Sequence, residues 1–228
     1  LTILEVLKTE EPKSGIATEG AELRLIAGLI HARQGDYDEA LEQFQSARHI
    51  AQQLDEMTAL ARAYNGLGLV HLRSDSTLAI EHFQQAFTLY ERTGNLNGQA
   101  LCHNAIANAC FSMGRWGEAN QHYYHAREIF EQVGDVYNQA IADNNLGGSA
   151  LKQGRLDEAL VFYQEALQSL EQIGGSLYLQ GVLHMNLGWT FVRRGETDAA
   201  RQQLHIGQDY FEQIQARDFL PELHRHFA

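Results

Sequence analysis

The chain has 228 residues, of which 44% are apolar, 9% are aromatic and only two are prolines. Helix-forming residues dominate this composition, which predicts an all-α fold. The formal net charge of -12 argues against a general nucleic-acid or anionic-membrane binder, because both rely on clustered Lys and Arg, so we expect neither as a direct partner.

The first 20 residues open on Leu1-Thr2-Ile3-Leu4, which reads like the interior of a helix. We interpret residues 1–20 as the end of a preceding repeat and a connecting loop. The sequence contains neither a run of about 18 apolar residues nor a charged and then apolar leader, so we expect a cytoplasmic protein.

A repeated pattern begins at about residue 21. One alanine recurs at intervals of 39, 40, 40 and 41 residues, followed four residues later by a large apolar residue and three further on by a small one. These offsets trace one face of a helix. Upstream of each alanine a small residue marks a second type of helix. In the later helix, the alanine column is Ala40, Ala79, Ala119, Ala159 and Ala200, and the large apolar column is Phe44, Phe83, Tyr123, Tyr163 and Leu204. The small column of the same helix is Ala47, Ala86, Ala126, Ala166 and Gly207. The small column of the earlier helix is Gly28, Gly68, Ala107, Gly147 and Gly188.

The pattern predicts five helix pairs, at about 21–59, 60–98, 99–138, 139–179 and 180–219. Residues 220–228 would start a sixth repeat or form a capping helix. A small residue facing a ring lets the two helices of a pair approach closely. Each pair leaves an apolar face that only its neighbour can cover, so the pairs should stack into a solenoid.

Glycines mark the ends of most of the predicted helices. Gly35, Gly114, Gly154 and Gly195 would end the first helix of four repeats through a positive φ. Gly94, Gly134 and Gly174 would end three second helices, with Asp55 and Gln215 in the outer two places. The second repeat is one residue short between Gly68 and Ala79, which predicts a kink or a shorter turn near Ser74 to Thr77.

The leucine–glycine pair and the Ala-x-x-x-Phe-x-x-Ala column resemble the tetratricopeptide signature over about residues 21–219. The unit of about 40 residues resembles the long repeats of kinesin light chains, the Leu-Gly-Asn repeat protein, bacterial signalling ATPases and maltose-type activators. This resemblance implies a right-handed superhelical α-solenoid of antiparallel helix pairs, whose concave groove is lined by the first helix of each repeat. The family's tryptophan column is absent, since Arg24, Tyr64, His103, Asp143 and His184 take its place.

The resemblance directs attention to the inward positions of the first helices, where six of the chain's ten asparagines fall. An asparagine amide both donates and accepts hydrogen bonds, so it can hold the backbone of a peptide, while apolar neighbours supply pockets. The alternative is that these asparagines bridge adjacent repeats or lie in water. The candidate peptide-binding residues are Arg62, Asn65, Leu69, Asn104, Asn108, Phe111, Asn144, Asn145, Asn186 and Trp189.

Five cations also lie along these inward positions. Arg33, Arg73, Lys152 and Arg193 occupy the last turns of first helices, where the helix dipole favours positive charge. Only Arg62 lies outside that explanation, so the pattern is weak evidence for a groove that binds acidic ligands.

Other chemistry finds little support in the sequence. His122 and His125 are three residues apart, but no further ligand completes a metal site at a compelling spacing. Cys102 and Cys110 would lie about 12 Å apart along a helix, too far for a disulfide, so we expect reduced thiols. No phosphate loop, dinucleotide fingerprint or nucleophile elbow occurs. We therefore expect no catalytic residues, metal or cofactor, and no enzyme.

Two functions remain open. In the first, the chain is a scaffold for protein–protein interaction in signal transduction, and its groove binds a peptide or helix of a partner or of the parent chain. In the second, it is the ligand-sensing or signal-peptide-sensing domain of a bacterial transcription regulator or signalling ATPase. Self-association through exposed terminal repeats is a further expectation.

Overall fold

The computed structural model describes residues 14–215, with side chains from residue 18 onward, and this range consists of ten α-helices joined by short turns. The expectations for residues 1–13 and 220–228 lie outside the described residues. The helices are α2 (Ser14–Gln34), α3 (Tyr37–Gln53), α4 (Met57–His71), α5 (Ser76–Thr93), α6 (Leu96–Ser112), α7 (Trp116–Val133), α8 (Val136–Lys152), α9 (Leu156–Gln172), α10 (Leu177–Arg194) and α11 (Thr197–Gln213). The predicted all-α helical-repeat fold is confirmed.

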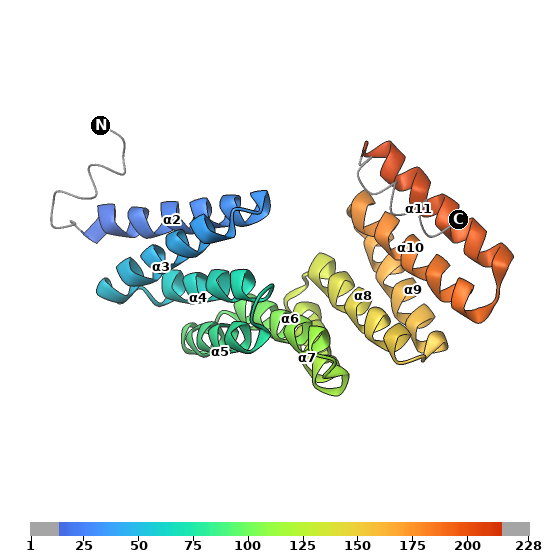
Figure 1. Ribbon diagram of the computed structural model, residues 1–228, viewed down its shortest axis with the longest axis horizontal. Coiled ribbons are helices and arrows are strands. Elements are labelled where there is room, and N and C mark those ends of the chain that lie inside the picture. Colours follow the sequence, from blue (N-terminus) through green and yellow to red (C-terminus); the bar gives the residue numbers. More distant parts are fainter. Residues whose placement is uncertain (1–13, 216–228) are drawn as a thin grey trace. The chain divides into compact units, whose positions relative to one another are not determined.

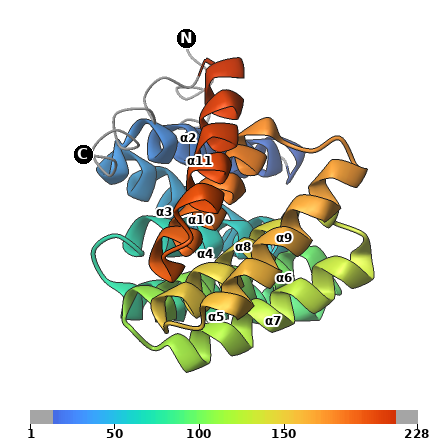
Figure 2. The same cartoon turned by 90° about the vertical axis from the view of Figure 1, so that its right-hand side faces the viewer.

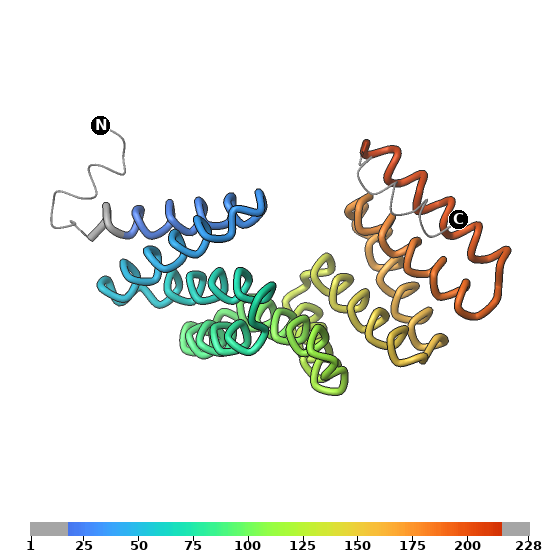
Figure 3. Tube along the Cα trace, viewed as in Figure 1, coloured from blue at the N-terminus to red at the C-terminus, as the bar shows by residue number. Residues whose placement is uncertain are grey.

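The chain divides into two compact units between His122 and Tyr123, within α7. In the first unit, α2 packs against α3 and α4 against α5, each pair running antiparallel (Figure 1). In the second unit, α8 packs against α9 and α10 against α11, and the turned view shows α10 and α11 side by side (Figure 2). The tube traces the chain reversing direction at each short turn within a unit (Figure 3). Helix α2 begins at Ser14, ahead of the expected repeat boundary at residue 21.

Small residues face large side chains inside the pairs, as the repeat pattern predicts. A Cβ atom added to Gly68 would lie 2.4 Å from the Phe83 ring, and one added to Gly147 would lie 2.5 Å from the Tyr163 ring. Gly188 faces Leu204 in the same way, at 2.4 Å. The absence of a side chain at these positions is therefore what allows the two helices of each pair to approach.

Two adjacent glycines of α8 provide a matched test of this packing. Gly147→Ala is expected to destabilise the fold by about 1 to 3 kcal/mol, because the new methyl group overpacks the interface with Tyr163. Gly148→Ala is expected to stabilise it by up to about 1 kcal/mol, because alanine is the better helix former. The nearest atom to a Cβ at position 148 is the Tyr163 hydroxyl at 3.8 Å, an ordinary contact. Urea unfolding of both variants measures the difference, and equal effects would contradict the packing model.

Left-handed residues end the helices where the sequence predicts them. Every glycine expected in a turn has a positive φ, from 60° at Gly174 to 89° at Gly35. Asp55 and Gln215 adopt the same conformation without being glycine, with φ of 54° and 55°. The repeat register, more than the residue type, thus fixes the backbone at these places.

The short second repeat is accommodated at the end of its first helix. Helix α4 ends at His71, three residues after Gly68, whereas α6 and α8 continue five residues past the equivalent Ala107 and Gly147. The turn that follows contains no residue with positive φ. Asp75 instead begins α5 by accepting hydrogen bonds from the backbone N–H groups of Thr77 and Leu78, both at 3.0 Å. This N-cap replaces the glycine turn.

Polar and aromatic contacts take the place of the missing tryptophan column. Four of its five residues contact the second helix of their own repeat, 18 or 19 residues later. Three of the five, including Asp143, contact the second helix of the preceding repeat, 16 residues earlier. The pairs of the first kind are Arg24–Gln43, Tyr64–His82, His103–His122 and His184–Gln203, and those of the second are Arg48–Tyr64, Phe87–His103 and Arg127–Asp143. The column therefore joins one repeat to the next, as well as the two helices of a pair.

Asp143 is the most buried of these polar residues, with 1% of its surface exposed. The Arg127 Nε donates to its Oδ1 at 2.5 Å, and the Arg127 Nη2 donates to Glu165 at 3.1 Å. The Asp143 Oδ2 is buried and has no hydrogen-bond partner among the described residues. Burial raises the pKa of Asp143 to about 6, although the Arg127 charge and hydrogen bond act to lower it.

Both cysteines are free and buried. Burial raises the pKa of the Cys102 thiol to about 12 and that of the Cys110 thiol in the same direction, so neither thiol has thiolate character. The described helices include none that is long and apolar enough to cross a membrane.

Candidate functional site

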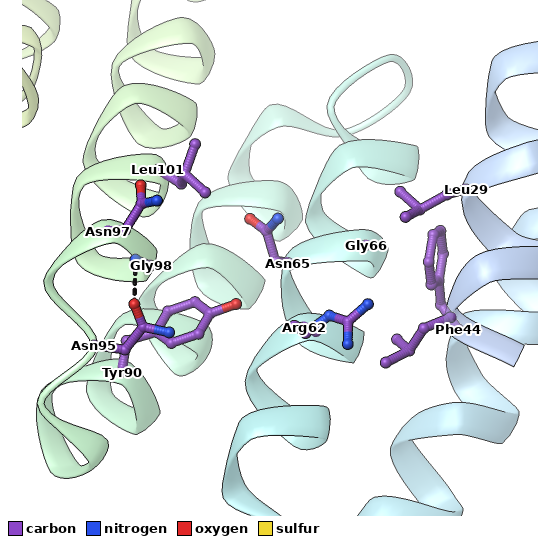
Figure 4. A pocket seen from close by; sticks show the side chains of 11 residues that line it. Leu29, Phe44, Arg62, Asn65, Gly66, Tyr90, Asn95, Asn97, Gly98 and Leu101 are labelled. Atoms are coloured by element: carbon purple, nitrogen blue, oxygen red, sulfur yellow. Dashed lines mark hydrogen bonds between the residues drawn. The ribbon is translucent and has the colours of Figure 1, made fainter. Parts of the chain in front are cut away.

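A pocket of about 270 Å³ opens on the first helices of the first unit (Figure 4). Helices α2, α4 and α6 supply most of its wall, and the end of α5 and the turn before α6 close it. The lining residues are Leu25, Leu29, Phe44, Arg62, Asn65, Gly66, Tyr90, Asn95, Asn97, Gly98 and Leu101. The structure thus brings two of the predicted site residues, Arg62 and Asn65, into one cavity.

Glycines determine how closely the pocket walls approach. The Phe44 ring lies against Gly66, where a Cβ atom would be 2.4 Å from it, and the Tyr90 ring lies against Gly98, where a Cβ would be 2.5 Å away. Gly98 falls in the first turn of α6, and its N–H donates to the Asn95 side chain at 2.9 Å (Figure 4). The N-cap of α6 therefore shapes the floor of the pocket as well as starting the helix.

Asn65 contributes the most distinctive polar atom. Its side-chain oxygen is buried, and no described residue donates a hydrogen bond to it. The side chain stands at the centre of the lining residues (Figure 4). A buried acceptor without a donor is costly, about 1 to 3 kcal/mol, so a ligand N–H or a water bound there would satisfy it.

Arg62 has a counter-ion inside the protein. Its Nη1 lies 2.5 Å from the Glu22 carboxylate of α2, and both side chains are partly exposed. Glu22 occupies the same repeat column as Arg62, 40 residues earlier. The one cation that helix capping left unexplained is therefore neutralised by an adjacent first helix, which weakens the case for a basic groove.

Apolar side chains surround these polar groups. Leu29 and Leu101 are 39% and 40% exposed at the rim of the pocket, and Leu69 on α4 is 41% exposed. Burial in the apolar wall raises the pKa of Tyr90 to about 12, so its hydroxyl stays neutral. The pocket offers a neutral, partly apolar surface with the unpartnered Asn65 acceptor and one paired cation.

In the second unit the predicted asparagines contact one another. The Asn186 side-chain amide of α10 donates to the Asn144 oxygen of α8 at 2.8 Å, and the Asn144 amide lies 3.5 Å from the Asn145 oxygen. These contacts match the alternative in which asparagines bridge adjacent repeats. The other predicted site residues, Asn104, Asn108 and Phe111 on α6 and Trp189 on α10, are half-buried and do not line the pocket.

Two of the cations in the last turns also contact neighbouring repeats. Arg193 donates to the backbone carbonyl of Leu151, near the end of α8, at 3.3 Å. The Arg73 guanidinium lies 4.7 Å from the centre of the Tyr37 ring. Both contacts fit the structural explanation of these charges.

Nine of the eleven lining residues are not among the predicted site residues. Leu25, Leu29, Gly66 and Leu101 lie on first helices and Phe44 in the ring column, whereas the others belong to the end of a second helix, a turn and a first helical turn; these are Tyr90, Asn95, Asn97 and Gly98. The run from Asn95 to Gly98 carries a recognisable N-cap, which was the available signal. Among the described residues, no three His, Cys, Asp or Glu side chains gather closely enough to hold a metal ion.

The tetratricopeptide repeat family model matches residues 21–92, 60–132 and 138–204. No curated protein matches the sequence significantly. Among solved structures, BtubC from P. vanneervenii superposes with a TM-score of 0.79 at 18% identity, over 93% of this chain and 88% of that one.

Two further similar structures are of longer proteins, and this chain matches only a part of each. The Rap conjugation gene regulator of plasmid pLS20, in complex with the Phr* peptide, gives a TM-score of 0.73 at 15% identity over 94% of this chain. A signal transduction ATPase with numerous domains from Pyrococcus horikoshii, which carries a tetratricopeptide repeat sensor, gives 0.79 at 14% identity over 92%. The chain spans 60% of the Rap regulator and 33% of the ATPase. At these identities the likeness shows the fold alone.

Proposed function

The chain belongs to the tetratricopeptide repeat family, and we propose that it is a non-catalytic scaffold whose first helices bind a peptide or helix of a partner protein or of the parent chain. The observation that carries the proposal is the pocket between α2, α4 and α6, with the buried Asn65 oxygen at its centre. An extended peptide carries an N–H group at nearly every residue, so it can satisfy this acceptor while its side chains cover Leu29 and Leu101.

The Arg62–Glu22 pair is compatible with such a ligand. A half-exposed ion pair contributes only about 0 to 1 kcal/mol, so exchanging Glu22 for a carbonyl or carboxylate of the ligand costs little. The proposed peptide therefore needs no acidic motif, and its contacts with the pocket are mainly backbone hydrogen bonds and apolar side chains. We include the remaining predicted residues in the proposal as further contacts along the first helices: Leu69, Asn104, Asn108, Phe111, Asn145 and Trp189. Asn144 and Asn186 could contact the peptide only if the hydrogen bond between them opens.

The second candidate is a sensing domain that responds to a small molecule or signal peptide. It is supported by the similarity to a regulator solved with the Phr* peptide and to an ATPase with a repeat sensor. The two candidates share the same pocket and differ in whether binding changes the output of a neighbouring domain.

A selection experiment tests the proposal. A random-sequence peptide library displayed on phage is selected against the full chain, and the enriched peptides are measured by fluorescence anisotropy. Asn65→Ala is expected to weaken binding roughly tenfold, because one buried hydrogen bond is lost, and Leu101→Asp by at least as much. Val161→Asp on α9, an exposed position of a second helix, is the matched control and should bind like the wild type. Equal binding by all three variants, with unchanged thermal midpoints, would contradict the proposal.

A further inference from the structure

Two histidines lie against each other between the helices of the second repeat. The rings of His71, at the end of α4, and His82, on α5, have centroids 5.4 Å apart and planes 29° apart. The Tyr64 ring of α4, seven residues before His71 on the same face, stacks on His82 at 6.0 Å. The Arg48 guanidinium of α3 lies 5.9 Å from the centre of the Tyr64 ring. We call these four residues, contributed by three helices, the histidine cluster.

The histidine cluster can carry three positive charges without a carboxylate to pair with them. Among the described residues, neither its two imidazoles nor Arg48 forms an ion pair, and the Arg48 Nε is buried without a hydrogen-bond partner. Three other histidines each have a carboxylate within 4.0 Å: His31–Asp36, His125–Glu128 and His205–Asp209. Protonation favours those pairs, whereas protonating both rings of the histidine cluster places like charges together.

The groups that surround the histidine cluster supply little negative charge. Glu81, next to His82 on α5, is exposed, and Asp75, in the turn after His71, uses its Oδ1 to cap α5. Helix α6, which packs against α5, carries no Asp, Glu, Lys or Arg. Other titratable groups of the neighbouring helices contact one another or their own helix: Glu22–Arg62, His49–Gln53 and His103–His122.

The titration of His82 agrees with this geometry. Burial lowers its pKa from the ordinary 6.5; the Gln85 hydrogen bond and the Glu81 charge oppose the shift, and the His71 and Arg48 charges add to it. The unfolded chain therefore binds this proton more readily than the folded protein. Stability from His82 is present above pH 6.5 and is lost as the pH falls through that value.

The histidine cluster lies in the same helix pair as part of the pocket. Helix α4 supplies Asn65 to the pocket and α5 supplies Tyr90 (Figure 4). The two helices approach closely where Gly68 meets the ring of Phe83, the residue after His82. A change in how α4 packs on α5 therefore moves the pocket residues relative to one another.

We propose that the histidine cluster is an acid-sensitive contact: protonation of His71 and His82 loosens the α4–α5 pair and thereby weakens peptide binding at the pocket. The proposal rests on the peptide-binding function proposed for that pocket. It adds a regulation of the site, in which a peptide bound at neutral pH is released at acidic pH.

Peptide affinity at two pH values tests this regulation in the full chain. A selected peptide without histidine and with an acetylated N-terminus is measured by fluorescence anisotropy at pH 8 and pH 5. The wild type is expected to bind at least about threefold more weakly at pH 5. His82→Phe keeps a stacked ring that cannot be protonated, so it should lose most of this pH dependence. His49→Phe, at an exposed position of α3, is the matched control and should respond to pH like the wild type.

Urea unfolding of the same proteins without peptide separates the two proposals. Relative to His82→Phe, the wild type should lose stability between pH 8 and pH 5, and the contribution of Asp143 cancels in this comparison. An equal pH response of stability in the wild type and His82→Phe would overturn the proposal, as would a peptide affinity that does not change with pH. Failure to select any peptide that binds the pocket would instead overturn the proposed function, and urea unfolding would still show whether the histidine cluster is acid-sensitive.

Discussion

Replacing Arg127 with methionine is expected to lower the free energy of unfolding by about 3 to 5 kcal/mol at pH 8, the cost of leaving a buried charge without its partner. Asp143 is almost completely buried, and Arg127 is the only described residue that donates a hydrogen bond to its carboxylate. Methionine preserves much of the length and apolar stem of the arginine side chain, so the loss reports on the charge and its hydrogen bonds.

The size of this loss should depend on pH. The pKa of Asp143 in the folded protein is raised to about 6, above its ordinary value of 3.8, so the folded state binds the proton more readily than the unfolded chain. Stability from this group is therefore present at low pH and is lost as the pH rises through about 6. Without Arg127 the pKa rises further, so the variant should regain stability as the pH falls from 8 to 5.

Urea unfolding at pH 8 and pH 5 measures both effects. Glu165→Gln removes the exposed partner of Arg127 and should cost less than about 1 kcal/mol. Adding Asp143→Asn to Arg127→Met should restore much of the lost stability at pH 8, because no buried charge remains. A small loss for Arg127→Met, or one that is the same at both pH values, would show that the pair contributes little to joining the repeats.

Phe44→Ala is expected to cost about 3 to 5 kcal/mol, the range for removing a buried ring. The Phe44 ring lies against Gly28 of α2 and Gly66 of α4, so it fills an intra-repeat and an inter-repeat interface together. Glycines on both sides cannot close the resulting cavity, because they have no side chains to move into it.

Phe44→Leu is the matched control. Leu204 occupies the same repeat column against Gly188 and is 3% exposed, so the column tolerates leucine. We expect a loss below about 1.5 kcal/mol for this substitution. Urea unfolding measures the loss of stability in the alanine and leucine variants. Similar urea midpoints for the two variants would mean that the ring is not central to either interface.

Much of the fold was predictable because the same contact, a small residue of one helix against a large side chain of the next, recurs in each repeat. The alanine and ring columns, the glycine-ended helices, and even the left-handed Asp55 and Gln215 follow from register alone. The adjustment of the second repeat was only partly predictable. The sequence indicates one missing residue, but whether the helix or the turn shortens depends on how well Asp75 caps α5.

The site was less predictable, because the inward positions of the first helices do not indicate which residues of other helices and turns lie against them. The inward positions of the first helices include Arg62 and Asn65 but not Tyr90 and Asn95, which reach the pocket from a helix end and a turn. The Arg62–Glu22 pair could have been found, since the two residues share one column 40 residues apart. The bond between Asn144 and Asn186 joins different columns, and only coordinates reveal it.

Mapping where a selected peptide binds tests the central claim, that first helices provide the binding surface. A photoreactive amino acid is placed at Leu69 or Leu101, on first helices, or at Val161, on a second helix; all three positions are exposed. After irradiation with bound peptide, the account predicts crosslinked peptide from Leu69 and Leu101 and none from Val161. Crosslinking from Val161 alone would place the peptide on the second helices and contradict the account.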